Sequence, residues 1–138
     1  MLFAVSDHQT VRLNLADGSV TEFRGHADSH HCQAEAMVLS DDDTVLCVAY
    51  IWAQCIVAYD VATLQLTWRV SLECAPCSVA YHDGTVLFAA NEALVTVVSA
   101  ADGSVVRTLG RAGGMMWGIS VFAGMRACMM HDAHMCWA

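Results

Sequence analysis

Apolar and polar residues alternate over short stretches of this chain with a period of two. Between Thr10 and Leu15 the apolar positions include Val11 and Leu13, each followed by a polar residue. Such alternation is typical of a β-strand with one buried face. The stretch is followed by Asp17-Gly18, and an Asp-Gly pair between two strand-like runs predicts a tight hairpin. We expect a type I′ turn, with positive φ at both central residues.

The same pattern returns twice. The stretch 2–20, LFAVSDHQTVRLNLADGSV, aligns without a gap to 87–105, LFAANEALVTVVSAADGSV, with 8 of 19 positions identical at a constant offset of 85. A third copy at 46–66, LCVAYIWAQCIVAYDVATLQL, is two residues longer and has no glycine in its turn. The three segments are therefore predicted to form equivalent antiparallel hairpins.

A repeat of about 40 to 45 residues with four short strands is the spacing expected of β-propeller blades. We expect an all-β fold whose blades are four-stranded antiparallel sheets, two of them complete and two partial. The blades are placed at about 2–24, 34–70, 77–109 and 117–122. These blades make a partial β-propeller domain over 1–122. The segment 123–138 loses the alternation and is expected to be an atypical C-terminal tail without a well-patterned closing strand.

Closure of a propeller ring needs about four blades, with one blade completed by strands from both ends of the chain. Two complete and two partial blades do not supply these four blades and the closing strands. The sequence therefore predicts an open arc, which is a piece of a larger propeller. Unpaired strand edges promote pairing with further strands. We therefore expect self-association through the open edges.

The second blade resembles the WD-repeat pattern. Gly25-His26 precedes a variable run, an apolar strand closes on Ser40-Asp41, and a later strand ends in Tyr59-Asp60, where the WD pattern has tryptophan before the aspartate. The resemblance covers about 40 residues well, and the chain is also similar to quinoprotein-like and lactonase-like propellers. It implies a rigid scaffold whose loops bind other proteins, and a blade-locking hydrogen bond from His26.

Composition narrows the partners and the compartment. The chain is 57% hydrophobic and 14% charged, which excludes disorder. Its net charge is −8, it has no lysine, and its six arginines are scattered, so nucleic acid is not an expected partner. Seven cysteines, an odd number, and the absence of a secretory signal predict a cytoplasmic protein with reduced thiols. The uncharged stretch 44–59 is shorter than the roughly 20 residues of a membrane span and is better explained by two strands.

Four groups of residues could hold a metal or do redox chemistry. Cys74 and Cys77 have C-x-x-C spacing but lie between two predicted strands, without the helix of a redox site or a second pair for zinc. The other groups are 131–136 (HDAHMC), 30–32 (HHC) and the acidic run 41–43. A terminal tail and solvated loops explain these three groups, so no metal site and no cofactor is predicted.

A propeller enzyme would gather loop carboxylates and histidines around its central channel. The candidates Asp7, His82 and Glu92 form no repeated set, so no catalytic or cofactor-binding residue is assigned. Core packing is expected for three tryptophans: Trp52, Trp68 and Trp117. The sequence thus favours a non-catalytic β-propeller segment that acts as a protein–protein interaction scaffold. The alternative is a fragment of a quinoprotein-like or lactonase-like propeller enzyme.

Overall fold

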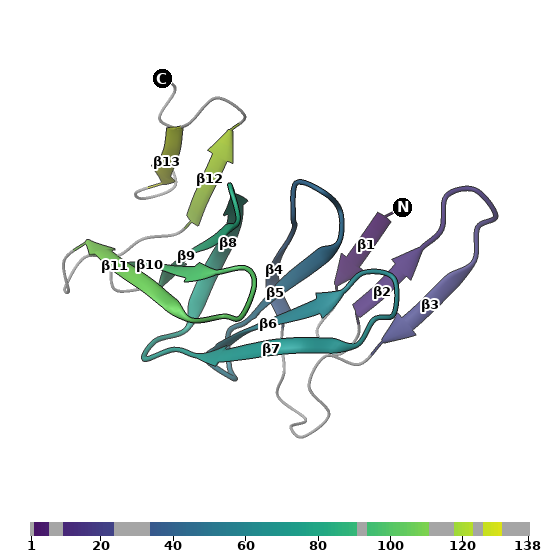
Figure 1. Ribbon diagram of the computed structural model, residues 1–138, viewed down its shortest axis with the longest axis horizontal. Coiled ribbons are helices and arrows are strands. Elements are labelled where there is room, and N and C mark those ends of the chain that lie inside the picture. The colour runs from purple at the N-terminus through teal and green to yellow at the C-terminus, as the bar shows by residue number, and fades with distance from the viewer. Residues whose placement is uncertain are drawn as a thin grey trace.

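The chain folds into β-sheets. The structure is a computed structural model, which describes residues 2–5, 10–23, 34–90, 94–110, 118–122 and 126–130. Every regular element in these ranges is a β-strand, and the strands form four antiparallel sheets arranged as blades along an arc (Figure 1). Within the same ranges, no helix has the length and hydrophobicity to span a membrane.

Two blades are complete. The second blade has the strand order β4-β5-β6-β7, and the third blade has the order β8-β9-β10-β11. Their bounds are β4 Ala34–Leu39, β5 Val45–Tyr50, β6 Cys55–Asp60, β7 Leu66–Ser71, β8 Pro76–His82, β9 Thr85–Ala90, β10 Leu94–Ser99 and β11 Val105–Gly110. Both are four-stranded antiparallel sheets, as predicted for propeller blades.

The first blade has three strands in the described residues: β1 Leu2–Val5, β2 Thr10–Leu13 and β3 Val20–Phe23. Its pairs β1–β2 and β2–β3 are antiparallel, as are β5–β6–β7 and β9–β10–β11. The prediction that 2–20, 46–66 and 87–105 form equivalent hairpins is therefore confirmed.

The fourth blade contains β12 Gly118–Phe122 and β13 Arg126–Met130, which pair antiparallel from Gly118–Met130 to Phe122–Arg126. Strand β13 lies in the segment 123–138, for which the sequence predicted no well-patterned closing strand. The sequence RACMM does not alternate, but backbone pairing with β12 does not depend on the alternation of side chains. The division of the chain into a propeller domain and a tail stays a prediction.

Neighbouring blades contact each other through their first strands, with β4 against β8 and β8 against β12. The last strands β3, β7 and β11 each lie at one edge of their sheet, and in the two complete blades this is the edge opposite to β4 or β8 (Figure 1). The molecule is thus a partial, open β-propeller.

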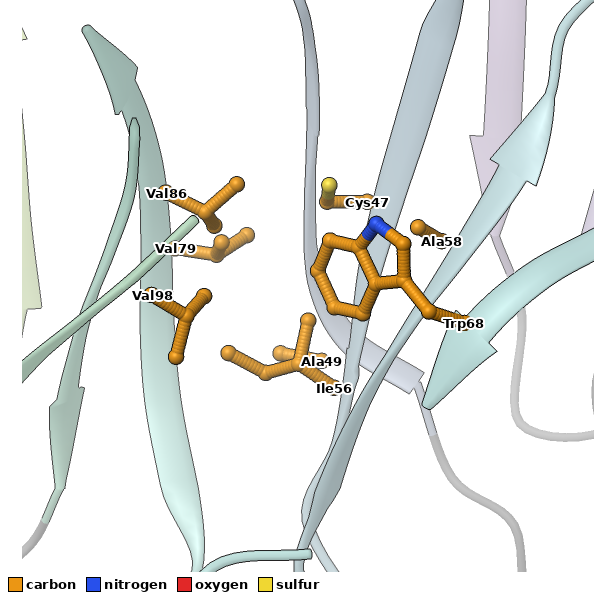
Figure 2. Packing of buried hydrophobic residues seen from close by; sticks show 8 residues of the cluster. All are labelled: Cys47, Ala49, Ile56, Ala58, Trp68, Val79, Val86 and Val98. Atoms are coloured by element: carbon orange, nitrogen blue, oxygen red, sulfur yellow. The ribbon is translucent and has the colours of Figure 1, made fainter. Parts of the chain in front are cut away.

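The second and third blades share a buried apolar cluster. Trp68 of β7 and Ile56 of β6 meet Val79, Val86 and Val98 of the third blade (Figure 2). Cys47, Ala49 and Ala58 complete the cluster. This cluster holds the two complete blades together, because apolar area is removed from water on both facing sheets.

A second cluster lies on the opposite face of the second blade. It includes Leu46, Val48, Val57, Tyr50 and Tyr59, and Phe3 of β1 packs against it. The two tyrosine hydroxyls lie 3.4 Å apart in this cluster. Strands β5 and β6 are therefore buried on both faces, which explains why this uncharged stretch is apolar at successive positions instead of alternating.

Candidate interaction surface

The last two strands of each of the first three blades are joined by the same four-residue turn. In each turn the residue before the loop donates its N–H to the carbonyl of the residue after it, at 2.9 Å: Asn14 to Ser19, Asp60 to Gln65 and Ser99 to Ser104. Only the last loop residue has the left-handed conformation: Gly18 (φ 71), Leu64 (φ 58) and Gly103 (φ 73).

The expected positive φ of Gly18 and Gly103 is confirmed, but the prediction of a type I′ turn is wrong. Asp17 and Asp102 do not have positive φ, whereas both central residues of that turn require it. The middle copy, without a glycine, adopts the same turn with Leu64 in the left-handed position. The hydrogen bonds around the loop, rather than the Asp-Gly pair alone, determine the turn.

Aspartate side chains stabilise the glycine-containing turns. Asp17 Oδ1 accepts the N–H of Ser19 at 2.8 Å. Asp102 Oδ1 accepts the N–H of Ser104 at 3.0 Å and its hydroxyl at 2.7 Å. Hydrogen bonds from these serines favour the charged carboxylates and lower the pKa of Asp17 and of Asp102. Both exposed side chains are therefore negative at neutral pH.

The second-blade turn uses a different aspartate for the same purpose. Asp60 Oδ1 accepts both the hydroxyl and the N–H of Thr63, each at 2.7 Å. The hydroxyl bond is the larger cause of the lowered pKa of Asp60. This pair supports the turn in which Leu64 replaces glycine.

The turn between the first and second strands of each complete blade lies beside the four-residue turn. Val61 donates its N–H to the carbonyl of Thr44 at 2.9 Å, and Ala100 donates its N–H to the carbonyl of Gly84 at 3.0 Å. Both kinds of turn therefore occupy one end of the sheets, which we name the turn face.

Aspartates gather on the turn face. Seven of the fourteen acidic residues of the chain lie in these turns: Asp17, Asp41, Asp42, Asp43, Asp60, Asp83 and Asp102. Asp42 is part of a local network, since its Oδ1 accepts the hydroxyls of Ser40 at 2.6 Å and Thr44 at 2.7 Å. These bonds lower the pKa of Asp42, with the Ser40 bond the largest cause. The run 41–43 thus shapes a turn.

Side chains of one blade bind the four-residue turn of the next. The Arg12 guanidinium donates from Nη1 to the carbonyl of Val61 at 3.0 Å. In the following pair of blades, Trp68 donates from Nε1 to the carbonyl of Ala100 at 2.8 Å. Val61 and Ala100 are both the first residue of their loop, so the same acceptor position serves both blade interfaces with different donors.

An aliphatic residue begins the outermost strand of each of these blades and remains exposed. The three residues are Val20, Leu66 and Val105, with 61%, 51% and 56% of their surface exposed. They pair with equivalent residues of the preceding strand: Leu13, Tyr59 and Val98. We call Val20, Leu66 and Val105 the outer-turn row.

The opposite end of the second blade carries Trp52, in the turn between β5 and β6. It is 68% exposed, so its expected place in the core is wrong. Trp68, by contrast, is 7% exposed and packs in the core as predicted. Cys74 precedes β8 and Cys77 lies within it, and both thiols are partly buried. Burial raises the pKa of Cys77, which makes its thiolate scarce at neutral pH.

Most of the other residues considered for sites lie outside the described residues: Asp7, His26, 30–32, Glu92, Trp117 and 131–136. His82 ends β8, and its backbone carbonyl accepts the Thr85 hydroxyl at 2.6 Å. Among the described residues, no three His, Cys, Asp or Glu side chains lie close enough together to hold a metal ion. The sequence analysis looked for reactive or metal-binding residues and did not identify the turn face with its aliphatic row. The signal that could have located it is the recurrence of equivalent turns in successive repeats.

Comparison with known proteins supports the propeller fold. No protein-family model and no curated protein sequence matches the chain. The WD40 repeats of RRP9 superpose with a TM-score of 0.75 at 15% identity, over 85% of this chain and 37% of theirs. The β-propeller BamB from Moraxella catarrhalis gives a TM-score of 0.67 at 13% identity, over 79% of this chain and 32% of that protein.

The computationally designed Ika4 protein is also similar, with a TM-score of 0.75 at 12% identity, over 94% of this chain and 78% of Ika4. The chain spans little more than a third of the length of the RRP9 structure. At these identities the similarity concerns the fold. The repeats are WD-repeat-like β-propeller blades.

Proposed function

We propose that this chain is a non-catalytic β-propeller segment that acts as a scaffold for protein–protein interactions. The observation that carries the proposal is the turn face, where successive blades present equivalent, hydrogen-bonded turns with exposed carboxylates and aliphatic side chains. The buried clusters on both faces of the second blade hold these turns in fixed positions. Loops on a rigid scaffold commonly serve as binding surfaces.

Similar structures support a protein partner. One similar chain, from a crystal structure of the mitotic checkpoint complex, has a TM-score of 0.75 at 13% identity, over 85% of this chain and 36% of that chain. The proposal includes self-association through open strand edges as a second mode of contact. We also propose that the protein is cytoplasmic. Cys47 and Cys55 are buried as thiols in two different clusters, and thiols remain reduced in the cytoplasm.

The test is recovery of a partner followed by a binary measurement. The purified 138-residue chain is immobilised, retained proteins are identified, and each is then produced alone and titrated against the chain by calorimetry. A saturable one-to-one complex supports the scaffold. Thermal melts with Ca²⁺, Zn²⁺ and Mg²⁺ run in parallel, because a propeller enzyme with a metal site gains stability from its ion. Metal-dependent stabilisation without any binary protein complex would contradict the proposal.

A further inference from the structure

The outer-turn row is an apolar feature that the core does not require. Val20, Leu66 and Val105 occupy the same register position in three blades, yet more than half of each side chain is exposed. A threonine would keep a β-branched side chain at an outer strand without exposing as much apolar surface to water. Exposed apolar surface that recurs at one position marks a binding surface more strongly than scattered aliphatic residues do.

Negative charge borders the row. Asp17 and Asp102 each lie three residues before the row residue of their blade, and Asp60 ends the strand before Leu66. Each carboxylate accepts hydrogen bonds within its own turn through Oδ1. The row therefore combines aliphatic contacts with ionised carboxylates.

Charge also distinguishes between possible occupants. A second copy of the chain would bring the same net charge of −8 and the same acidic turns, which repel each other. A cationic partner is attracted to this face, and the aliphatic stems of lysine and arginine can lie along apolar surface while their charges meet carboxylates. Arg12 reaches the second-blade turn, where it donates to the carbonyl of Val61, while Arg69 and Arg107 lie farther along the outer strands. The seven aspartates of the turn face outnumber this one arginine, so we place the partner's cationic residues over the turns.

From these observations we infer that the outer-turn row, with Asp17, Asp60 and Asp102, docks a partner-protein segment in which lysine or arginine residues are interspersed with aliphatic residues. The inference rests on the proposed scaffold function and names the chemistry of its partner. It assigns the aliphatic residues of the segment to the row and its cations to the turn carboxylates.

The probe is a fluorescein-labelled peptide of four Lys-Leu-Lys-Ser repeats, titrated with the full 138-residue chain by fluorescence anisotropy. The comparison peptides are four Glu-Leu-Glu-Ser repeats and four Lys-Ser-Lys-Ser repeats. The first peptide should bind at least about tenfold more tightly than either comparison peptide, and its affinity should fall as salt rises. Equal binding of the two lysine peptides would show attraction by charge alone and overturn the role of the row.

Variants separate the row from general stickiness. The triple variant Val20→Thr, Leu66→Thr, Val105→Thr should weaken binding about tenfold or more, while threonine, a residue favoured in strands, occupies all three positions. The matched control replaces three exposed apolar residues elsewhere by threonine: Trp52, Val106 and Leu109. It should bind as the parent chain does. An equal loss in both variants overturns the inference.

A charge variant tests the carboxylates. Asp17→Asn, Asp60→Asn, Asp102→Asn keeps the Oδ1 acceptor of each turn and removes the charge, so the turns persist while affinity and salt dependence both fall. Sedimentation velocity on the parent and row variants detects the other occupant. If the parent self-associates through the row and does not bind the peptide, the occupant is a second copy and the inference is wrong. If a partner recovered by the immobilised chain binds the row variant unchanged, the inference fails while the scaffold function stands.

Discussion

Replacing Gly103 by alanine should destabilise the protein more than the same replacement at Gly18. The two glycines occupy the last position of equivalent turns and have nearly the same φ, 73° and 71°. Their surroundings differ. A Cβ atom at Gly18 meets nothing within 4 Å, whereas at Gly103 it would lie 2.6 Å from Cε3 and 2.9 Å from Cδ2 of Trp68. The pair therefore separates the cost of backbone conformation from the cost of contact with the next blade.

The backbone cost is common to both sites and amounts to about 1 kcal/mol for an L-residue in the left-handed region. At Gly103 the tryptophan ring must also move, and overpacking costs about 1 to 3 kcal/mol. Movement of the ring weakens the 2.8 Å bond from Nε1 to Ala100, a hydrogen bond worth about 1 kcal/mol. We expect a loss of about 1 kcal/mol for Gly18→Ala and about 2 to 5 kcal/mol for Gly103→Ala.

Urea unfolding monitored by circular dichroism gives both free energies of unfolding. A double-mutant cycle isolates the contact: in a Trp68→Val background, Gly103→Ala should cost no more than Gly18→Ala, because the ring is gone. Equal losses for the two alanine variants in the parent chain would refute the reasoning. So would an unchanged cost of Gly103→Ala after removal of the ring, because the clash could then not be its cause.

Further predictions concern the middle turn, the blade interface, a buried thiol and an exposed carboxylate. Leu64→Gly should raise the free energy of unfolding in urea by about 0.5 to 1 kcal/mol, because Leu64 has φ 58, and no gain would contradict strain at this turn. Trp68→Phe should lower the thermal midpoint and cost about 1 to 3 kcal/mol, because the partly buried carbonyl of Ala100 loses its donor; an unchanged midpoint would make that bond unimportant. Burial raises the pKa of Cys47 from 9.0 to about 12, so the thiol ionises at lower pH in the unfolded chain than in the folded one. The free energy of unfolding should therefore fall by about 1.4 kcal/mol between pH 8 and pH 10. Cys47→Ala should lack this part of the fall, and identical pH profiles of the two proteins would disprove the role of Cys47. Because the pKa of Asp60 is lower in the folded chain, its carboxylate contributes stability above pH 3.8 that is lost as the pH falls through the folded pKa. The free energy of unfolding should therefore fall less steeply with decreasing pH in Asp60→Asn than in the parent chain. Equal steepness would show that Asp60 makes no contribution to acid unfolding.

Local pattern was enough to predict the blades. The period of two, the repeat at an offset of 85 and the Asp-Gly pairs place strands that the structure shows, because strand alternation and turn preference act within a few residues. The same logic failed for β13, whose residues Arg126–Met130 do not alternate. This strand is formed by backbone pairing with β12, although its side chains show no strand pattern.

The details of the turns were beyond local reading. The Asp-Gly pairs suggested two-residue turns, but the hydrogen bond from Asn14 to Ser19 and its equivalents close four-residue loops. The sequence also gave no sign that Leu64 adopts the conformation of Gly18 and Gly103. The hydrogen bonds of Asp60 and the packing of the two flanking strands together outweigh the backbone strain at Leu64. A preference that considers Leu64 alone therefore does not predict its left-handed conformation.

The sequence by itself determined what the protein is built of: short strands, turns and a repeated four-stranded unit. The tertiary structure alone decided which side chains are buried between blades and which are presented outward. Trp68 and Trp52 both lie in or beside strand patterns, yet one fills the interface with the third blade and the other is exposed at the opposite end. Burial depends on whether a neighbouring blade covers a position, and that neighbour comes from some 30 residues away along the chain, out of reach of any local pattern.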